Sequence, residues 1–421
     1  MKKRIIGYIF HPLIAGSSII FIGSFISNIA SYLFNLLMGR ILSVSEYGLL
    51  TSLSSMIVLF GIFQVSFTSI FARFSAKYKA KKDASRLSML ISNGFRVVIL
   101  FDLALFVVLL ISIPGFGNFL HVKNLWLVFM IFLSVFVSIL YSLPYGVLQG
   151  EMRFVLLSFL NILAPMIKIL VAVPLVVVGY SVFGAIVGIL LSALIPLVIV
   201  AVIVKKQFKR VQARLKETEE FFTEFKKYST QLLIASLGIT IISNADIVLV
   251  RHFFDPVTSG QYAALSLMGK AIFYMTAPIY FVLFPLIAHK REKGEKVFET
   301  LLLAFAIVAL ISITISFVYF TFPHLVLNIF FPAPDYKALA PYLGPYSVYI
   351  VIFSIAYLFS NFFLSIGKTG VYKFNLIAGL LFVVGIIFFH KSLFEVIANL
   401  FIISLLLMIS LLIYYLYHGR D

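Results

Sequence analysis

Twelve long apolar stretches are the feature of this sequence that most restricts its fold. Each has about the length, roughly 20 residues, that an α-helix needs to cross the hydrocarbon core of a bilayer. The stretches are 12–38, 48–71, 89–112, 124–147, 155–178, 182–204, 229–250, 263–287, 298–320, 341–365, 372–389 and 393–416. Soluble domains carry about 25% charged residues, whereas this chain carries 12%. We therefore predict an all-α polytopic membrane protein with about 12 transmembrane helices.

The basic residues predict the orientation of these helices. With the N-terminus inside, the inside segments hold 25 Lys and Arg residues and the outside loops hold 5. Such an excess marks the cytoplasmic side of a membrane protein. It also accounts for the net charge of +17 without a nucleic acid partner. We predict a multi-pass protein of the cytoplasmic membrane with both termini in the cytoplasm, whose first stretch is a retained helix because it is too long for a signal peptide.

Short motifs recur in the same order in the two halves of the chain. The matching segments are 35–40 with 246–251, 46–50 with 261–265, and 148–154 with 364–374. Both halves would begin and end inside, which is typical of a parallel repeat related by an axis along the membrane normal. We predict a six-helix N-terminal lobe (1–204), a basic amphipathic cytoplasmic linker (205–227) and a six-helix C-terminal lobe (228–421).

Charged side chains within or beside the apolar stretches are candidate functional residues, because a charge in hydrocarbon is costly. Most are basic, which suits an anionic substrate, and Lys and Arg are the usual protein partners of phosphate. The substrate-binding candidates are Lys168, Arg96, Lys270, Arg73, Arg40 and Arg251. Arg96 and Lys270 could instead extend toward the membrane surface. The two acids, Asp102 and Asp246, are candidates for ion coupling or gating.

Two stripes of polar residues run along the first helix of each half, at steps of three, four and seven residues that keep them on one helix face. The stripes consist of Ser24, Asn28, Ser31 and Asn35, and of Ser236, Thr240 and Asn244. One interpretation is helix–helix packing through small polar side chains. The other is a shared water-filled cavity.

Several enzyme classes lack their necessary residues in this sequence. There is no cysteine, no phosphate-binding G-x-x-x-x-G-K-[ST] segment and no histidine pair at metal-ligand spacing. The acids are too scattered for a membrane-embedded glycosyltransferase, and we interpret Glu46, Asp255 and Asp335 as solvated caps in loops. We therefore expect no enzyme activity and no cofactor, and we leave open whether H+ or Na+ serves as a coupling ion.

Three motifs resemble those of a known family. They are Gly39-Arg40-Ile-Leu-Ser-Val-Ser-Glu46-Tyr47-Gly48, Leu148-Gln-Gly-Glu-Met-Arg153-Phe154, and Asn244-Ala-Asp246 leading to Gly260-Gln261-Tyr262. With twelve spans in two halves, the chain resembles the polysaccharide-biosynthesis flippases, the Wzx-like branch of the multidrug/oligosaccharidyl-lipid/polysaccharide (MOP) exporter superfamily. The resemblance implies a MATE-like V-shaped pair of lobes around a central cavity, in which basic residues bind the diphosphate of a polyprenyl-linked oligosaccharide. It also implies movement of that substrate from the inner to the outer leaflet by alternating access.

Three functions stay open at this point. The first is a flippase for a lipid-linked oligosaccharide, with membrane lipids around it and a polysaccharide polymerase and glycosyltransferases as candidate partners. The second is a cation-coupled multidrug antiporter, to which Asp102 and Asp246 would supply ion sites. The third is a membrane scaffold for glycan synthesis, which predicts that the polar stripes are fully packed.

Overall fold

The computed structural model describes residues 12–208, 219–292, 297–366 and 368–418. Within these ranges the chain consists of helices joined by short connections, and no strand occurs. The predicted all-α fold is confirmed. The basic N-terminal residues and part of the predicted linker, residues 209–218, lie outside the described residues.

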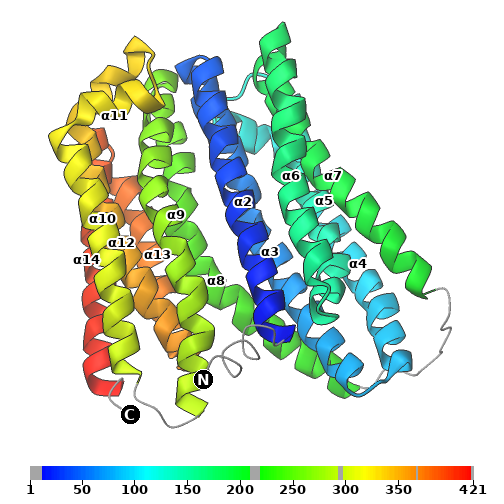
Figure 1. The fold of residues 1–421 in the computed structure, drawn as a ribbon. Coiled ribbons are helices and arrows are strands. Elements are labelled where there is room, and N and C mark those ends of the chain that lie inside the picture. Colours follow the sequence, from blue (N-terminus) through cyan, green and yellow to red (C-terminus); the bar gives the residue numbers. More distant parts are fainter. Residues whose placement is uncertain (1–11, 209–218, 293–296, 367, 419–421) are drawn as a thin grey trace. The chain divides into compact units, whose positions relative to one another are not determined.

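Each of the twelve predicted stretches coincides with a helix (Figure 1). The long helices are α2 (Pro12–Ile41), α3 (Val44–Ala80), α4 (Ala84–Phe119), α5 (Leu125–Gly150), α6 (Phe154–Leu175), α7 (Ser181–Phe208), α8 (Glu219–Phe253), α9 (Pro256–Glu292), α10 (Phe298–Thr321), α12 (Ala340–Ser365), α13 (Tyr372–Phe388) and α14 (Leu393–His418). Short helical turns add η1 (Val176–Tyr180), α11 (Pro323–Phe330), η2 (Pro334–Leu339) and η3 (Thr369–Val371).

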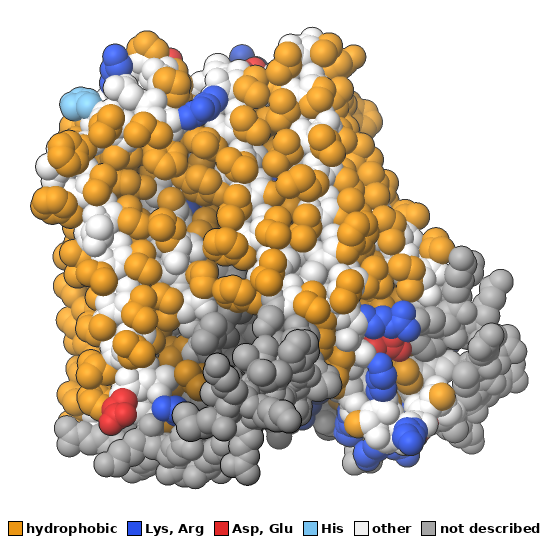
Figure 2. All heavy atoms as spheres, viewed as in Figure 1, with side chains coloured by type: hydrophobic (Ala, Val, Ile, Leu, Met, Phe, Trp, Pro, Cys, Tyr) orange, Lys and Arg blue, Asp and Glu red, His pale blue; other side chains and the backbone are white. Residues whose placement is uncertain are grey.

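The described helices are apolar enough for lipid. Eight stretches among the described residues could cross a membrane by length and composition, one of them being the continuous stretch Phe154–Val204 that contains both α6 and α7. Large apolar side chains also point outward, such as Ile111 at 76% and Leu100 at 68% exposure. Hydrophobic side chains cover most of the described part of the face shown in Figure 2. A surface of this kind is stable only where lipid replaces water.

The chain divides into two compact units. The first contains residues 1–34 and 56–233, and the second contains residues 35–55 and 234–421. Helices α2 and α3 therefore contribute to both units, because each continues across one of these boundaries. The predicted lobes divide the chain at the central linker alone, and the exact lobe boundaries stay a prediction.

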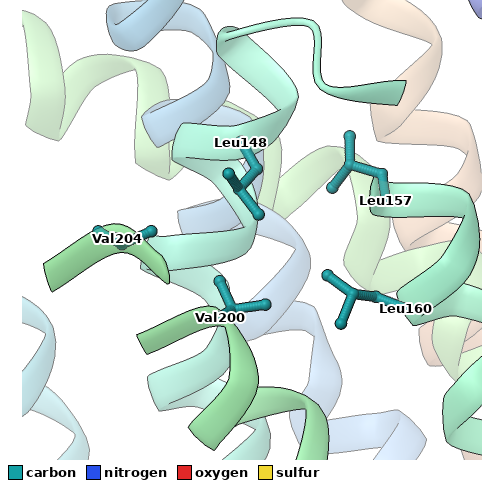
Figure 3. Packing of buried hydrophobic residues seen from close by; sticks show 5 residues of the cluster. All are labelled: Leu148, Leu157, Leu160, Val200 and Val204. Carbon is teal, nitrogen blue, oxygen red and sulfur yellow. The ribbon is translucent and has the colours of Figure 1, made fainter. Parts of the chain in front are cut away.

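The first unit is held together by close packing of α5, α6 and α7. Figure 3 shows Leu148 of α5, Leu157 and Leu160 of α6, and Val200 and Val204 of α7 meeting in a buried apolar cluster. Leu148 opens one of the motifs found in the sequence, so this motif has a packing role.

The connection between α6 and α7 depends on one glycine. The chain reverses direction within the turn η1, where Gly179 has φ 107°, in the left-handed region. A side chain at this position would be strained, whereas glycine adopts this conformation readily. The tight turn explains why two membrane helices follow one another here with almost no polar loop.

Helix α12 is the core of the second unit. It packs against α9, α10 and α14, and more than half of its residues are buried, among them Leu343, Tyr346 and Phe353. Residues 44–48 of α3 also join this unit at a very close helix contact. A Cβ atom on Gly260 would collide with the carbonyl oxygen of Val44, and one on Gly48 would lie 2.6 Å from the nitrogen of Gly260. The two helices can therefore approach this closely only because neither glycine has a side chain.

Two predicted caps are present. Ser43 and Glu46 form a capping box at the start of α3, in which the Ser43 N–H donates to Glu46 Oε2 at 3.0 Å and the Glu46 N–H donates to Ser43 Oγ at 3.4 Å. At the start of α9, the N–H groups of Val257 and Thr258 donate to Asp255 Oδ1 at 3.0 and 3.1 Å. The interpretation of Glu46 and Asp255 as caps is confirmed.

We predict that replacing Asp255 with Ala lowers the stability of the protein by about 1 kcal/mol at neutral pH, the usual loss on removing an N-cap. Hydrogen bonds from the Thr258 side chain and from the backbone N–H groups of Thr258 and Val257 hold the pKa of Asp255 below its ordinary value. This contribution is therefore complete above the ordinary Asp pKa of about 3.9 and is lost as the pH falls through the lower pKa of the folded state. Unfolding in detergent at several pH values measures both effects.

Two control variants accompany this measurement. Asp255→Asn keeps a cap and should retain most of the stability while losing its pH dependence. Asp335→Ala removes an exposed acid elsewhere in the same unit and should change little. An Asp255→Ala variant as stable as the wild type would contradict the prediction.

Candidate functional site

A buried acid lies between three helices of the second unit. Asp246 of α8 is 2% exposed, and the hydroxyl of Tyr262 on α9 donates to its Oδ2 at 2.8 Å. Among the described residues, its other oxygen, Oδ1, has no hydrogen-bond partner. Tyr262 is itself fully buried. The carboxyl group is thus withdrawn from solvent.

Lys270 approaches this acid along α9. Its Nζ lies 3.4 Å from Oδ1 of Asn244, which is two residues before the acid on α8. Lys270 and Asp246 also interact electrostatically. The sequence predicted these three residues for three separate roles: substrate binding by Lys270, a polar stripe containing Asn244, and coupling by Asp246. The structure brings all three together, and we call them, with Tyr262, the Asp246 cluster.

Aromatic side chains of α12 enclose the Asp246 cluster. The Tyr262 ring meets the ring of Tyr346 edge to face at 5.9 Å, and Tyr346 meets Tyr349 at 5.3 Å. Both tyrosines of α12 are buried. The sequence analysis missed them, although their spacing of three residues within an apolar helix puts two hydroxyl groups on one face.

The first unit contains a half-buried base with different surroundings. The Nζ atom of Lys168 on α6 lies 4.5 Å from the centre of the Phe34 ring, a cation–π contact. One face of α6 also carries Asn161, whose Oδ1 accepts a hydrogen bond from the Tyr145 hydroxyl at 2.9 Å. No ion pair to an acid is made by Lys168 within the described part of the chain. Its charge is therefore stabilised by an aromatic ring rather than by a carboxylate.

Arg96 and Asp102, both on α4, are not brought together. Arg96 is exposed, whereas Asp102 is 1% exposed and both of its oxygens lack hydrogen-bond partners among the described residues. Arg73, on α3, is also exposed. Arg73 and Arg96 thus lie on the surface of the first unit, and Asp102 lies in its interior.

The polar stripes are neither fully buried nor fully exposed. In α2 the stripe crosses from residues of the first unit into residue 35 of the second. In α8 the Asn244 side chain also donates to the carbonyl oxygen of Thr240 at 3.4 Å. All members are half-buried: Ser24, Asn28, Ser31, Asn35, Ser236, Thr240 and Asn244.

The two arginines that match in the repeat make different contacts. Arg40 donates from Nε to the carbonyl oxygen of Phe330 at 2.9 Å and from Nη2 to that of Ile329, which are the last two residues of α11. Beside it, the Tyr336 hydroxyl donates to the carbonyl oxygen of Gly39 at 3.2 Å. We call these contacts the Arg40 clasp. Arg251 is buried instead and donates to Ser259 Oγ at 3.1 Å.

The described residues contain no group of three or more His, Asp or Glu side chains that could hold a metal ion. The contacts described above define two candidate sites, which are the Asp246 cluster and Lys168 with its aromatic neighbour Phe34.

Comparison with known families decides the affiliation of the chain. Residues 13–291, more than half of the sequence, match the family described as polysaccharide biosynthesis protein. The chain belongs to this family. No curated protein matches the sequence.

Solved structures place this family member in a wider fold group. The chain is similar to an inward-facing multidrug resistance MATE family transporter of the MOP superfamily, with a TM-score of 0.74, 14% identity and 93% coverage of both chains. It is also similar to the lipid II flippase MurJ in an inward closed conformation, with a TM-score of 0.73, 15% identity and coverage of 93% of this chain and 86% of MurJ. A third neighbour is a MOP superfamily transporter from Pyrococcus furiosus with a reported reversed polarity of its binding pocket, at a TM-score of 0.59, 14% identity and coverage of 95% and 94%. The predicted MOP fold is confirmed.

We predict that Tyr262→Phe destabilises the protein by about 1–3 kcal/mol, because it removes the hydrogen bond to a buried acid. The matched control is Tyr319→Phe, since the buried Tyr319 hydroxyl donates to the neutral carbonyl of Met268 at 2.9 Å. Bonds to charged groups are roughly twice as strong as neutral ones. Equal losses of unfolding free energy for the two variants would contradict a charged Asp246.

We predict that Arg40→Gln loosens α11, because the two carbonyl groups at the end of this helix lose their guanidinium donor. The sequence has no cysteine, so a single cysteine at the exposed Asn328 of α11 can carry a spin label. Arg40→Gln should increase the mobility of this label. Arg86→Gln, which removes a surface arginine 3.4 Å from Asp83, should leave it unchanged, and an unchanged spectrum in both variants would refute the prediction.

Proposed function

We propose that this protein is a flippase that moves an anionic, polyprenyl-diphosphate-linked oligosaccharide from the inner to the outer leaflet of the cytoplasmic membrane. Membership of the polysaccharide biosynthesis family supports a role in glycan export. The fold supports transport, because it is shared with MOP superfamily transporters. The same considerations favour a transporter over an enzyme.

Lys168 is the observation that carries this proposal. Inserting a lysine into the membrane within an apolar helix costs about 2.5–3.5 kcal/mol if its side chain faces lipid. Here the ammonium group rests on Phe34 and forms no ion pair with a described acid. A cation–π contact contributes about 0.5–2 kcal/mol and leaves the positive charge available to an anion. A diphosphate passing this position would supply the missing negative charge.

The other basic candidates would act on the same anion at other stages of transport. Arg73 and Arg96 are exposed on the first unit, where they could attract a diphosphate before it reaches Lys168. An ammonium or guanidinium group binds phosphate by charge-assisted hydrogen bonds. The membrane potential favours the proposed direction, since moving one negative charge outward gains about 2.3 kcal/mol per 100 mV.

Alternating access would use the division of the chain into two units. Helices α2 and α3 belong to both units, so any relative movement must bend these helices or release residues 35–55 from the second unit. The Arg40 clasp and the contact of Gly48 with Gly260 hold these residues. We therefore assign the clasp, rather than substrate binding, as the main role of Arg40 in the cycle.

A cation-coupled multidrug antiporter is the second candidate. The likeness to a MATE family transporter and the buried Asp102 favour it. An organic cation, however, would be repelled by Lys168, and the buried Asp246 already has Lys270 beside it. The flippase agrees better with the basic charge of the first unit. Its candidate partners are the membrane lipids, a polysaccharide polymerase and glycosyltransferases.

We predict that Lys168→Met lowers the initial rate of flipping at least tenfold, which corresponds to about 1.4 kcal/mol of lost interaction with the anion. The assay is transfer of a lipid-linked oligosaccharide with a labelled sugar across the bilayer of proteoliposomes. Lys168→Arg keeps the positive charge and should retain most of the activity. Lys123→Met, at an exposed position between α4 and α5, is the matched control and should behave as the wild type.

The same preparation tests the alternative. Efflux of an organic cation driven by a proton or sodium gradient would favour the antiporter, above all if Lys168→Met increased it. If Lys168→Met flips the substrate at the wild-type rate, Lys168 has no role in the mechanism.

A further inference from the structure

We propose that Lys270 is a built-in counter-cation for Asp246 and occupies the position in which an exchangeable monovalent cation would otherwise bind. The inference concerns the ion chemistry of the second unit. It stands apart from the identity of the transported substrate, because it can be tested without transport.

The first step is that a buried, ionised Asp246 is stabilised by a nearby positive charge. Asp246 is 2% exposed, and a single hydroxyl, from Tyr262, donates to it. Neutral hydrogen bonds of this kind, even with the neighbouring backbone N–H groups, do not offset the loss of hydration of a buried carboxylate. Its Oδ1 atom has no hydrogen-bond partner in the part of the chain that the structure describes. A positive charge close to Oδ1 would stabilise the ionised acid.

The second step is the placement of Lys270. It follows Tyr262 on α9 by eight residues, a rise of about 12 Å along a helix. Long side chains on a helix lean toward its N-terminus, so the lysine extends back toward the level of Tyr262. There its ammonium group reaches Oδ1 of Asn244 at 3.4 Å and interacts electrostatically with Asp246.

The third step is the nature of the oxygen atoms. The carboxylate of Asp246, the amide oxygen of Asn244 and the hydroxyl of Tyr262 are the hard oxygen donors that alkali and alkaline-earth cations prefer. A single carboxylate matches one positive charge. The lysine ammonium provides this charge from within the chain, so the wild-type protein needs no Na+ or K+ here. Removing the lysine side chain would leave both an unneutralised acid and space for an ion.

The experiment compares the full-length protein with Lys270→Met, Asp246→Asn and the double variant. The apparent Tm in detergent is measured in NaCl, KCl and choline chloride at equal ionic strength. The wild type should show the same Tm in all three salts. Lys270→Met should gain about 3 °C or more in NaCl or KCl relative to choline chloride, rising with concentration, and the double variant should lose this gain. Lys290→Met is the matched control, because Lys290 donates to the neutral Thr300 hydroxyl at 2.9 Å.

Two results would overturn the proposal. One is a wild type that Na+ or K+ stabilises through Asp246, since the ion would then bind beside the lysine. The other is Lys270→Met with no preference between cations. If Lys270→Met does not fold, recovery of folding in the double variant supports the pair, and failure to recover counts against it. Infrared spectra of the wild type and Asp246→Asn give an independent readout, because a protonated-acid band assigned to Asp246 would also refute an ion pair.

Discussion

Much of the packing of the second unit depends on the free-energy cost of burying the Asp246 carboxyl group among apolar side chains. Asp246 on α8 draws its hydrogen bond from Tyr262 on α9, and the aromatic rings of α12 close over that tyrosine. Three helices are thereby fixed relative to one another at a single buried point. In surroundings without water, an unpaired acid is far more costly than a paired one. The stability of the second unit therefore depends on the identity of the side chains around Asp246.

The two units deal with charged side chains on their apolar helices in different ways. In the second unit an acid and a base lie in one cluster, so that the positive charge of Lys270 is already matched by Asp246. In the first unit Lys168 rests on the Phe34 ring, and the buried Asp102 has no hydrogen-bond partner among the described residues. A passing anion would meet an unmatched base in the first unit and a neutralised pair in the second. This asymmetry supports the proposal that the anion binds in the first unit.

The internal repeat preserves local structure while its buried contacts diverge. Glu46 and Asp255 are not matched positions, yet each caps the helix that follows the corresponding loop. Arg40 and Arg251, which do match in the repeat, make different contacts: the first holds the end of α11 and the second donates to Ser259. Caps depend on neighbouring backbone N–H groups, which any helix start provides. The arginine contacts depend on which other element lies nearby: Arg40 meets the end of α11, whereas Arg251 meets the start of α9.

Much of this protein could be predicted without its structure. The all-α membrane fold follows from twelve apolar stretches, because only a helix satisfies its own backbone hydrogen bonds within a single segment in lipid. The caps Glu46 and Asp255 follow from local spacing. The expectation that Asp246 is a functional residue follows from the cost of an acid in an apolar helix. Each of these conclusions depends on residues close together in the chain.

The partners of the charged residues were decided by tertiary structure alone. No pattern in the sequence joins Lys270 to Asn244, which is 26 residues away on another helix, or joins Lys168 of α6 to Phe34 of α2. The enclosing tyrosines of α12 also come from a distant segment. Helix periodicity specifies the face on which a residue lies, whereas the packing of one helix on another selects the side chain that it meets. The sequence therefore determined which residues were costly to bury, and the tertiary fold determined what offsets each cost.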